Sequence, residues 1–147
     1  QQAIIIKPDY VEIHYNLGVT LQEQGKHDLA VASYKQALAI KANYVEALFN
    51  LGGTLHELGR YSEAVESYQQ AIKIKPDYAQ AYNSLGITYK KLAQYDNAII
   101  NYNKAIKLKP DHALAYNNLG TVYLEQKKFE ESLNCFNKTI KIKSIES

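Results

Sequence analysis

A passage of ten residues returns almost unchanged along this chain at a fixed interval. The sequence QQAIIIKPDY (residues 1–10) reappears as QQAIKIKPDY (69–78) and as NKAIKLKPDH (103–112). The last two copies are 34 residues apart and the first two are 68 apart, twice that period. A fourth copy, KQALAIKANY, occupies the expected place at 35–44. A fixed period of about 20 to 50 residues indicates a repeat architecture, in which each repeat is one supersecondary unit.

The remainder of each repeat recurs in step with this passage. Four positions hold, in order, a glycine, a small residue, an aromatic residue and a second small residue. They are Gly18, Ala30, Tyr34 and Ala37; Gly52, Ala64, Tyr68 and Ala71; Gly86, Ala98, Tyr102 and Ala105; and Gly120, Ser132, Phe136 and Thr139. The chain therefore divides into repeats 11–44, 45–78, 79–112 and 113–147, and residues 1–10 are interpreted as the tail of a preceding repeat.

Each repeat has the pattern of two helices. Apolar residues in 45–58 and again in 61–74 recur three and four residues apart, the spacing of one helix face. Gly59 between them suits the left-handed conformation that ends a helix, and Pro76 stops the second helix. The period predicts first helices at 11–24, 45–58, 79–92 and 113–126 and second helices at 27–40, 61–74, 95–108 and 129–142. The fold class expected is an all-α solenoid, because a two-helix repeat buries its apolar faces only by stacking.

The period and the pattern of small and large residues resemble those of the tetratricopeptide repeat family over the whole chain. The resemblance implies a right-handed superhelix of stacked antiparallel helix pairs. It also implies a concave groove that is lined by the first helices and binds peptide segments of other proteins. Ala93 and Lys127 depart from the pattern, because they stand where the first two repeats have a glycine between the helices.

Amide side chains recur on the predicted exposed side of the first helices. Asn16, Asn50 and Asn118 occupy one repeat position, and Ser84 takes it in the third repeat. Asparagine both donates and accepts hydrogen bonds, so such residues can pair with the backbone of an extended ligand. The arrangement resembles the asparagine ladder in the superhelical repeats of O-linked N-acetylglucosamine transferase. Two interpretations stay open: contact with a ligand, or a common form of the repeat whose amides face water.

The same exposed side changes character along the chain. The first two repeats place Tyr15, Phe49 and Glu57 there, whereas the last two place Asn83, Asn117, Lys90 and Lys91 there. This gradient favours a ligand with one basic, apolar end and one acidic or polar end. Mixed charges on a solvated helix face are the alternative.

Composition and motifs exclude several other functions. The formal net charge of +2 is small for a nucleic-acid-binding domain, and no apolar run is long enough to span a bilayer. Cys135 is the only cysteine, which excludes an internal disulfide and favours a reducing compartment such as the cytoplasm. The four histidines occupy four different repeat positions without zinc-binding spacing. We expect no catalytic residues, no metal and no cofactor.

These observations predict a non-catalytic module that binds an extended polypeptide segment. One alternative is the substrate-targeting region of a larger transferase whose catalytic domain lies outside these residues. Another is a self-assembling scaffold, because Phe136 and Ile140 form an apolar edge after which no further first helix follows. An uncovered apolar edge is typical of an interface.

Overall fold

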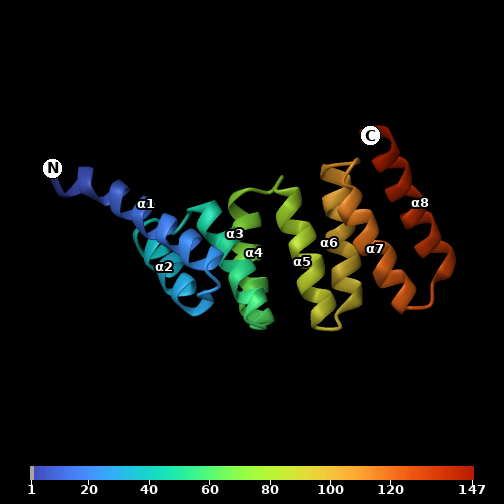
Figure 1. The fold of residues 1–147 in the computed structure, drawn as a ribbon, viewed down its shortest axis with the longest axis horizontal. Helices are drawn as coiled ribbons and strands as arrows, with labels where there is room; N and C mark the ends of the chain where they lie inside the picture. The colour runs from blue at the N-terminus through green and yellow to red at the C-terminus, as the bar shows by residue number, and fades with distance from the viewer. Residues whose placement is uncertain (1) are drawn as a thin grey trace. The chain divides into compact units, whose positions relative to one another are not determined.

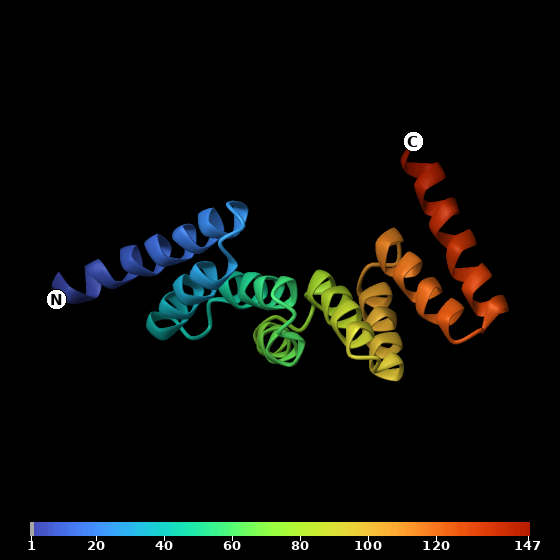
Figure 2. The same cartoon turned by 60° about the horizontal axis from the view of Figure 1, so that its bottom comes forward.

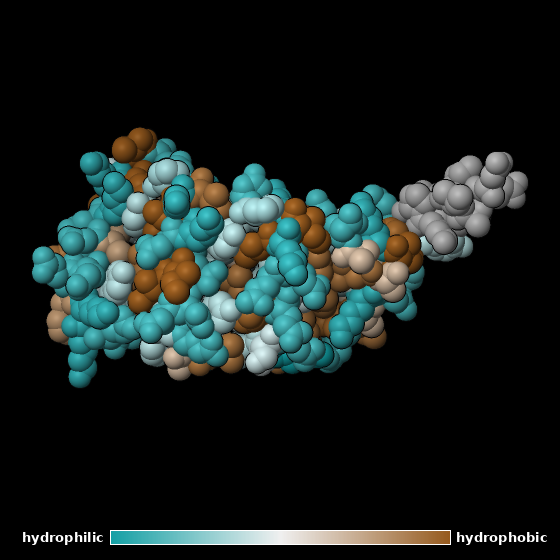
Figure 3. Space-filling view, turned by 180° about the vertical axis from the view of Figure 1, so that it is seen from behind, coloured by the Kyte–Doolittle hydropathy of each residue, from teal (hydrophilic) through white to brown (hydrophobic). Residues whose placement is uncertain are grey.

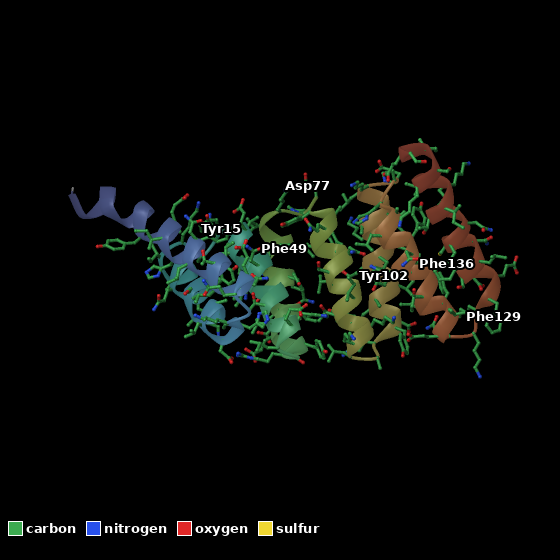
Figure 4. The ribbon with its side chains drawn as sticks, viewed as in Figure 1. Tyr15, Phe49, Asp77, Tyr102, Phe129 and Phe136 are labelled. Atoms are coloured by element: carbon green, nitrogen blue, oxygen red, sulfur yellow. The ribbon has the colours of Figure 1, made fainter. Side chains whose placement is uncertain are left out.

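The computed structural model describes the backbone of residues 2–147 and the side chains from Tyr10 onward. Eight helices follow one another, and no strand occurs within this described range. The chain divides between Pro76 and Asp77 into two compact units, each built of two helix pairs (Figure 4). The prediction of an all-α fold built from helix pairs is confirmed.

Unit 1 contains α1 (Gln2–Glu23), α2 (His27–Ile40), α3 (Val45–Glu57) and α4 (Tyr61–Ile74). Its extensive contacts join α1 to α2, α2 to α3, and α3 to α4 (Figure 1). Unit 2 contains α5 (Ala79–Lys91), α6 (Tyr95–Leu108), α7 (Ala113–Glu125) and α8 (Phe129–Glu146), packed in the same succession. Figure 2 shows the short turn inside each pair and the reversal of direction that it produces.

The predicted helix boundaries hold to within about one residue except at two places. The helix α1 begins at Gln2 and continues through Pro8, whereas the first helix is predicted at 11–24 and residues 1–10 are interpreted as the tail of a preceding repeat. The helix α8 continues to Glu146, four residues beyond the predicted 142. The helix α8 contacts α7, and α1 contacts α2 and, less extensively, α3, whereas the turns at 41–44 and 109–112 join helices that contact each other, α2 with α3 and α6 with α7. The side chains of residues 1–9, in the expected tail of a preceding repeat, lie outside the described residues.

A glycine on the first helix of each pair receives an aromatic ring from the second. A Cβ atom built on Gly52 would lie 2.7 Å from Cε1 of Tyr68, and one built on Gly86 would lie 2.4 Å from Cε1 of Tyr102. Gly18 and Gly120 meet Tyr34 and Phe136 in the same way. The three tyrosines are buried, and so is every alanine at the two small positions. Glycine is therefore required here for close approach of the two helices.

The last pair keeps this packing although hydroxyl residues replace its two alanines. Ser132 Oγ donates a hydrogen bond to the carbonyl of Gly120 at 2.9 Å, and Thr139 Oγ1 donates to the carbonyl of Cys135 at 3.0 Å. Both buried hydroxyls are thus satisfied, which removes the cost of burying them unpaired.

The turn inside each pair uses one left-handed residue. Gly25 and Gly59 have φ values of 75° and 74°. Ala93 and Lys127 adopt 57° and 60°, so the two turns of unit 2 keep the conformation without the residue best suited to it. A left-handed residue with a Cβ costs roughly 1–2 kcal/mol, which the packing of the helix pair must offset.

Adjacent glycines in α3 provide a matched test of the packing. We expect Gly52→Ala to lower the free energy of unfolding by about 1–3 kcal/mol, because the new methyl group would overlap the buried Tyr68 ring. Gly53→Ala should raise it by about 0.5–1 kcal/mol, because its Cβ would lie 3.6 Å from the Tyr68 hydroxyl and alanine favours the helix. Urea unfolding followed by circular dichroism measures both, and equal effects would contradict the packing argument.

Candidate functional site

We define the first-helix face as the sides of α1, α3, α5 and α7 that point away from the second helices. Ten residues that the sequence predicts to bind a ligand lie on these helices. The structure leaves nine of them exposed or half-buried. Exposed are Asn16, Glu57, Lys91 and Asn117; half-buried are Tyr15, Phe49, Asn50, Lys90 and Asn118. The first-helix face thus presents most of the predicted residues to solvent, within each unit separately.

Asn83 is the exception and corrects the sequence-based expectation. Its side chain is 4% exposed, and its Oδ1 accepts a hydrogen bond from Nδ2 of Asn118 at 3.1 Å. The helix α7 contacts α5 at this place and covers the amide. Asn83 therefore belongs to the packing between neighbouring repeats and is not a ligand-facing residue.

The same kind of bond joins the first helices of unit 1. Nδ2 of Asn50 donates to the hydroxyl of Tyr15 at 3.0 Å. Both amide bonds span 35 residues, so each links one repeat position to the following position of the next repeat. An asparagine side chain offers two donor hydrogens and an acceptor oxygen, so one donated bond leaves capacity for a ligand. The structure thus shows Asn50 and Asn118 hydrogen-bonded to the preceding repeat, and ligand binding by them stays a prediction.

This bridging predicts a loss of stability. Asn50→Ala and Asn118→Ala should each lower the free energy of unfolding by about 0.5–1.5 kcal/mol, the net value of one hydrogen bond. The exposed Asn16→Ala and Asn117→Ala are matched controls and should change it by less than about 0.5 kcal/mol. Thermal or urea unfolding of the four variants provides the comparison. Equal effects in the two pairs would refute the bridging role.

Aromatic rings gather on the first-helix face of unit 1. Tyr15 stacks on Tyr44 with ring centroids 4.9 Å apart and lies tilted 6.0 Å from Tyr34. Phe49 lies tilted against Tyr68, with ring centroids 5.6 Å apart. Tyr15 and Phe49 are labelled in Figure 4. The sequence-based set did not include Tyr44, which directly precedes α3. The sequence feature that could have identified Tyr44 is the ring that ends every copy of the ten-residue passage, a tyrosine in three copies and a histidine in the fourth.

Carboxylates surround this aromatic cluster. Burial raises the pKa of Tyr44, and Glu12, Tyr15 and Glu46 raise it further. Burial is also the main reason that the pKa of Tyr34 is raised to about 12. A hydrogen bond with Asn50 lowers this pKa, and the negative charge of Glu23 raises it. We call the exposed acids and half-buried rings of the first helices in unit 1, together with Tyr44, the acidic aromatic face; it comprises Glu12, Tyr15, Glu23, Tyr44, Glu46 and Phe49.

The raised pKa of Tyr34 predicts a specific loss of stability in alkali. The folded chain holds this proton more tightly than the unfolded chain, in which the pKa is near the ordinary 10.0. The contribution to stability is therefore complete below pH 10 and is lost as the pH rises through about 12. Tyr34→Phe should show a smaller fall in the free energy of unfolding across this window than the wild type. An unchanged pH profile would contradict it.

Unit 2 pairs part of its predicted binding set internally. Lys90 Nζ lies 3.1 Å from Oε1 of Glu125. A hydrogen bond to the same Glu125 carboxylate raises the pKa of the Tyr95 hydroxyl. The predicted lysine pair is thus divided, because Lys90 is held within the unit while Lys91 is exposed. Of the two lysines expected to attract the acidic end of a ligand, only Lys91 is therefore without this ion pair.

The described residues hold no cluster of three histidine, cysteine, aspartate or glutamate residues that could bind a metal ion. The thiol of Cys135 is buried, and burial raises its pKa, which disfavours the reactive thiolate. Within the described range, none of the helices combines the length and the apolar character that a bilayer span requires.

Comparison with known proteins agrees with the helix pairs. A family model described as TPR repeat matches residues 1–25, 21–59 and 52–93, and one described as tetratricopeptide repeat matches 77–144. A crystal structure of MamA is 28% identical with a TM-score of 0.90, over 99% of this chain and 85% of that one. Another crystal structure of MamA protein is also 28% identical, with a TM-score of 0.87 over 96% of this chain and 77% of that one.

More distant structures agree in fold alone. The structure of MamA 41-end from Desulfovibrio magneticus RS-1 is 23% identical, with a TM-score of 0.89 over 93% of this chain and 77% of that chain. A comparison with curated proteins gave no match.

Proposed function

Because the chain belongs to the tetratricopeptide repeat family, we propose that its acidic aromatic face binds an extended polypeptide segment with alternating basic and apolar side chains. Repeats of this family and the similar MamA structures support a protein-interaction or scaffold module. The kind of partner follows from the chemistry of the face in unit 1.

The joint presence of rings and carboxylates is the observation that carries this proposal. Tyr15 and Phe49 offer half-buried aromatic surface, on which apolar side chains of a ligand can pack. Glu12 and Glu46 are exposed and lie close enough to Tyr44, which stacks on Tyr15, to raise its pKa, and they attract lysine or arginine. An ammonium or guanidinium group can also lie over an aromatic ring, which adds about 0.5–1 kcal/mol at an exposed site.

The amide of Asn16, which follows Tyr15 on α1, can bind backbone groups of a ligand beside the acidic aromatic face. It is exposed, and it can both donate to and accept from an extended chain. Successive side chains of such a chain point to opposite sides, so every second residue can face the protein. An alternating sequence therefore matches the face better than a continuous charge run.

The first-helix face of unit 2 is the weaker candidate. Lys90 is paired with Glu125, and Asn118 is bonded to Asn83. The transferase alternative was motivated by the amide spacing, which these bridges between repeats account for. It therefore stays a prediction from the sequence.

The test uses two short fluorescein-labelled peptides, one of alternating lysine and leucine and one of alternating glutamate and leucine. Fluorescence anisotropy should show that the lysine peptide binds the wild-type chain more tightly. Added salt should weaken this binding, because exposed charges are screened beyond about 8–10 Å at physiological ionic strength.

Glu12→Gln with Glu46→Gln should weaken binding of the lysine peptide about tenfold, which corresponds to about 1.4 kcal/mol. The matched double variant Glu66→Gln with Glu130→Gln removes two exposed acids elsewhere and should bind like the wild type. Equal binding of the two peptides, or equal loss in the two double variants, would overturn the proposal.

A further inference from the structure

Two helices of the chain expose apolar stripes of different composition. On α8 the C-terminal stripe consists of Phe129, Leu133, Phe136 and Ile140, which are spaced four, three and four residues apart on one helix face. Three of its side chains are 59–66% exposed, and Phe136 is half-buried against Gly120. On α1 the N-terminal stripe consists of Tyr10, Ile13 and Leu17, which are 47–57% exposed.

The interior junctions within each unit show what covers such stripes. Leu51 of α3 and Leu119 of α7 occupy the repeat position of Leu17 and are at most 5% exposed, where α3 contacts α2 and α7 contacts α6. On the other side of the second junction, Tyr102 stands at the position of Phe136 and is buried with Leu119 in one core cluster. Ile99 and Ile106, at the positions of Leu133 and Ile140, pack against the same cluster.

We propose that the C-terminal stripe of one molecule packs against the N-terminal stripe of a second copy, head to tail, in the manner of the α6–α7 junction. In repeat position, the C-terminal stripe corresponds to the side of α6 that faces α7, and Leu17 of the N-terminal stripe corresponds to Leu119 on α7. This inference does not require the proposed peptide binding, because neither stripe contains a residue of the acidic aromatic face; the two surfaces meet at Glu12. On the face drawn in Figure 3, apolar side chains form patches separated by hydrophilic ones.

The charges beside the stripes agree with this pairing. In the antiparallel register of the α6–α7 junction, the C-terminal half of α8 would lie beside residues 11–17 of the partner's α1. Lys141 and Lys143 on α8 are exposed, and so is Glu12 on α1. One difference from the interior junctions is Ile13, because Ala47 and Ala115 at its repeat position are fully buried. The contact between copies must therefore be wider at this point.

A head-to-tail contact has a recognisable consequence in solution. Every assembly keeps one free stripe of each kind, so growth continues beyond a dimer unless a ring closes. A contact between two C-terminal stripes would instead stop at two copies. The two arrangements can therefore be separated by measuring mass.

The experiment measures the weight-average mass of the chain by sedimentation over a wide range of concentration. The wild type should increase in mass with concentration beyond two copies. Ile140→Glu and Ile13→Glu each remove one stripe and should each stay at the mass of one chain. Ile100→Glu is the matched control, because Ile100 is 64% exposed on α6 outside both stripes, and it should associate like the wild type. Circular dichroism checks that each variant keeps its helices.

Mixing the two stripe variants gives the decisive result. Ile13→Glu keeps an intact C-terminal stripe and Ile140→Glu keeps an intact N-terminal stripe, so the mixture should form a complex of two chains and no larger species. A wild type that stays monomeric at every concentration would overturn the proposal. So would association of Ile13→Glu alone, or a mixture that remains at the mass of one chain. At a chain concentration at which the wild type is monomeric, binding of the lysine peptide should be the same in Ile140→Glu as in the wild type, which separates this test from that of the proposed function.

Discussion

The contact between a glycine and an aromatic ring sets the distance between the two helices of every pair. Gly52 and Gly86 leave room that Tyr68 and Tyr102 fill, and no other residue could replace these glycines without moving the ring. Once that distance is fixed, the alanines of the second helix are buried and the opposite side of the first helix faces outward. The exposed faces therefore inherit their geometry from a contact that takes no part in binding.

The bonds between successive first helices build on this spacing. Asn50 bridges to Tyr15, Asn118 bridges to Asn83, and Lys90 pairs with Glu125. In each case the partners lie one repeat plus one residue apart, because neighbouring first helices are offset by about one position. The polar residues of unit 2 are largely engaged in this way, whereas unit 1 keeps exposed carboxylates beside its rings. This difference between the units, more than their common fold, distinguishes their surfaces chemically.

The repeat period predicted the helices well, because a 34-residue unit allows little choice once its glycine, alanine and aromatic positions are known. It did not predict the continuation of α1 through Pro8 or of α8 to Glu146. It also failed at Asn83, because helix periodicity places a residue on a face without showing which neighbour covers it. A search for complementary side chains 35 residues apart would have found the two amide bonds and the ion pair.

The offset of one position has a consequence for how such an array can change in length during evolution. The residue that receives or makes each bridge is supplied by the adjoining repeat, and the bridging position is asparagine in three of the four repeats. If the segment 11–44 were duplicated, Asn16 of the new copy would stand where Asn50 now meets Tyr15. Duplication of this repeat would therefore reproduce the bond, whereas duplication of the second repeat would place asparagine beside Phe49 and lose it. An insertion whose length is not a multiple of 34 residues would separate the partners.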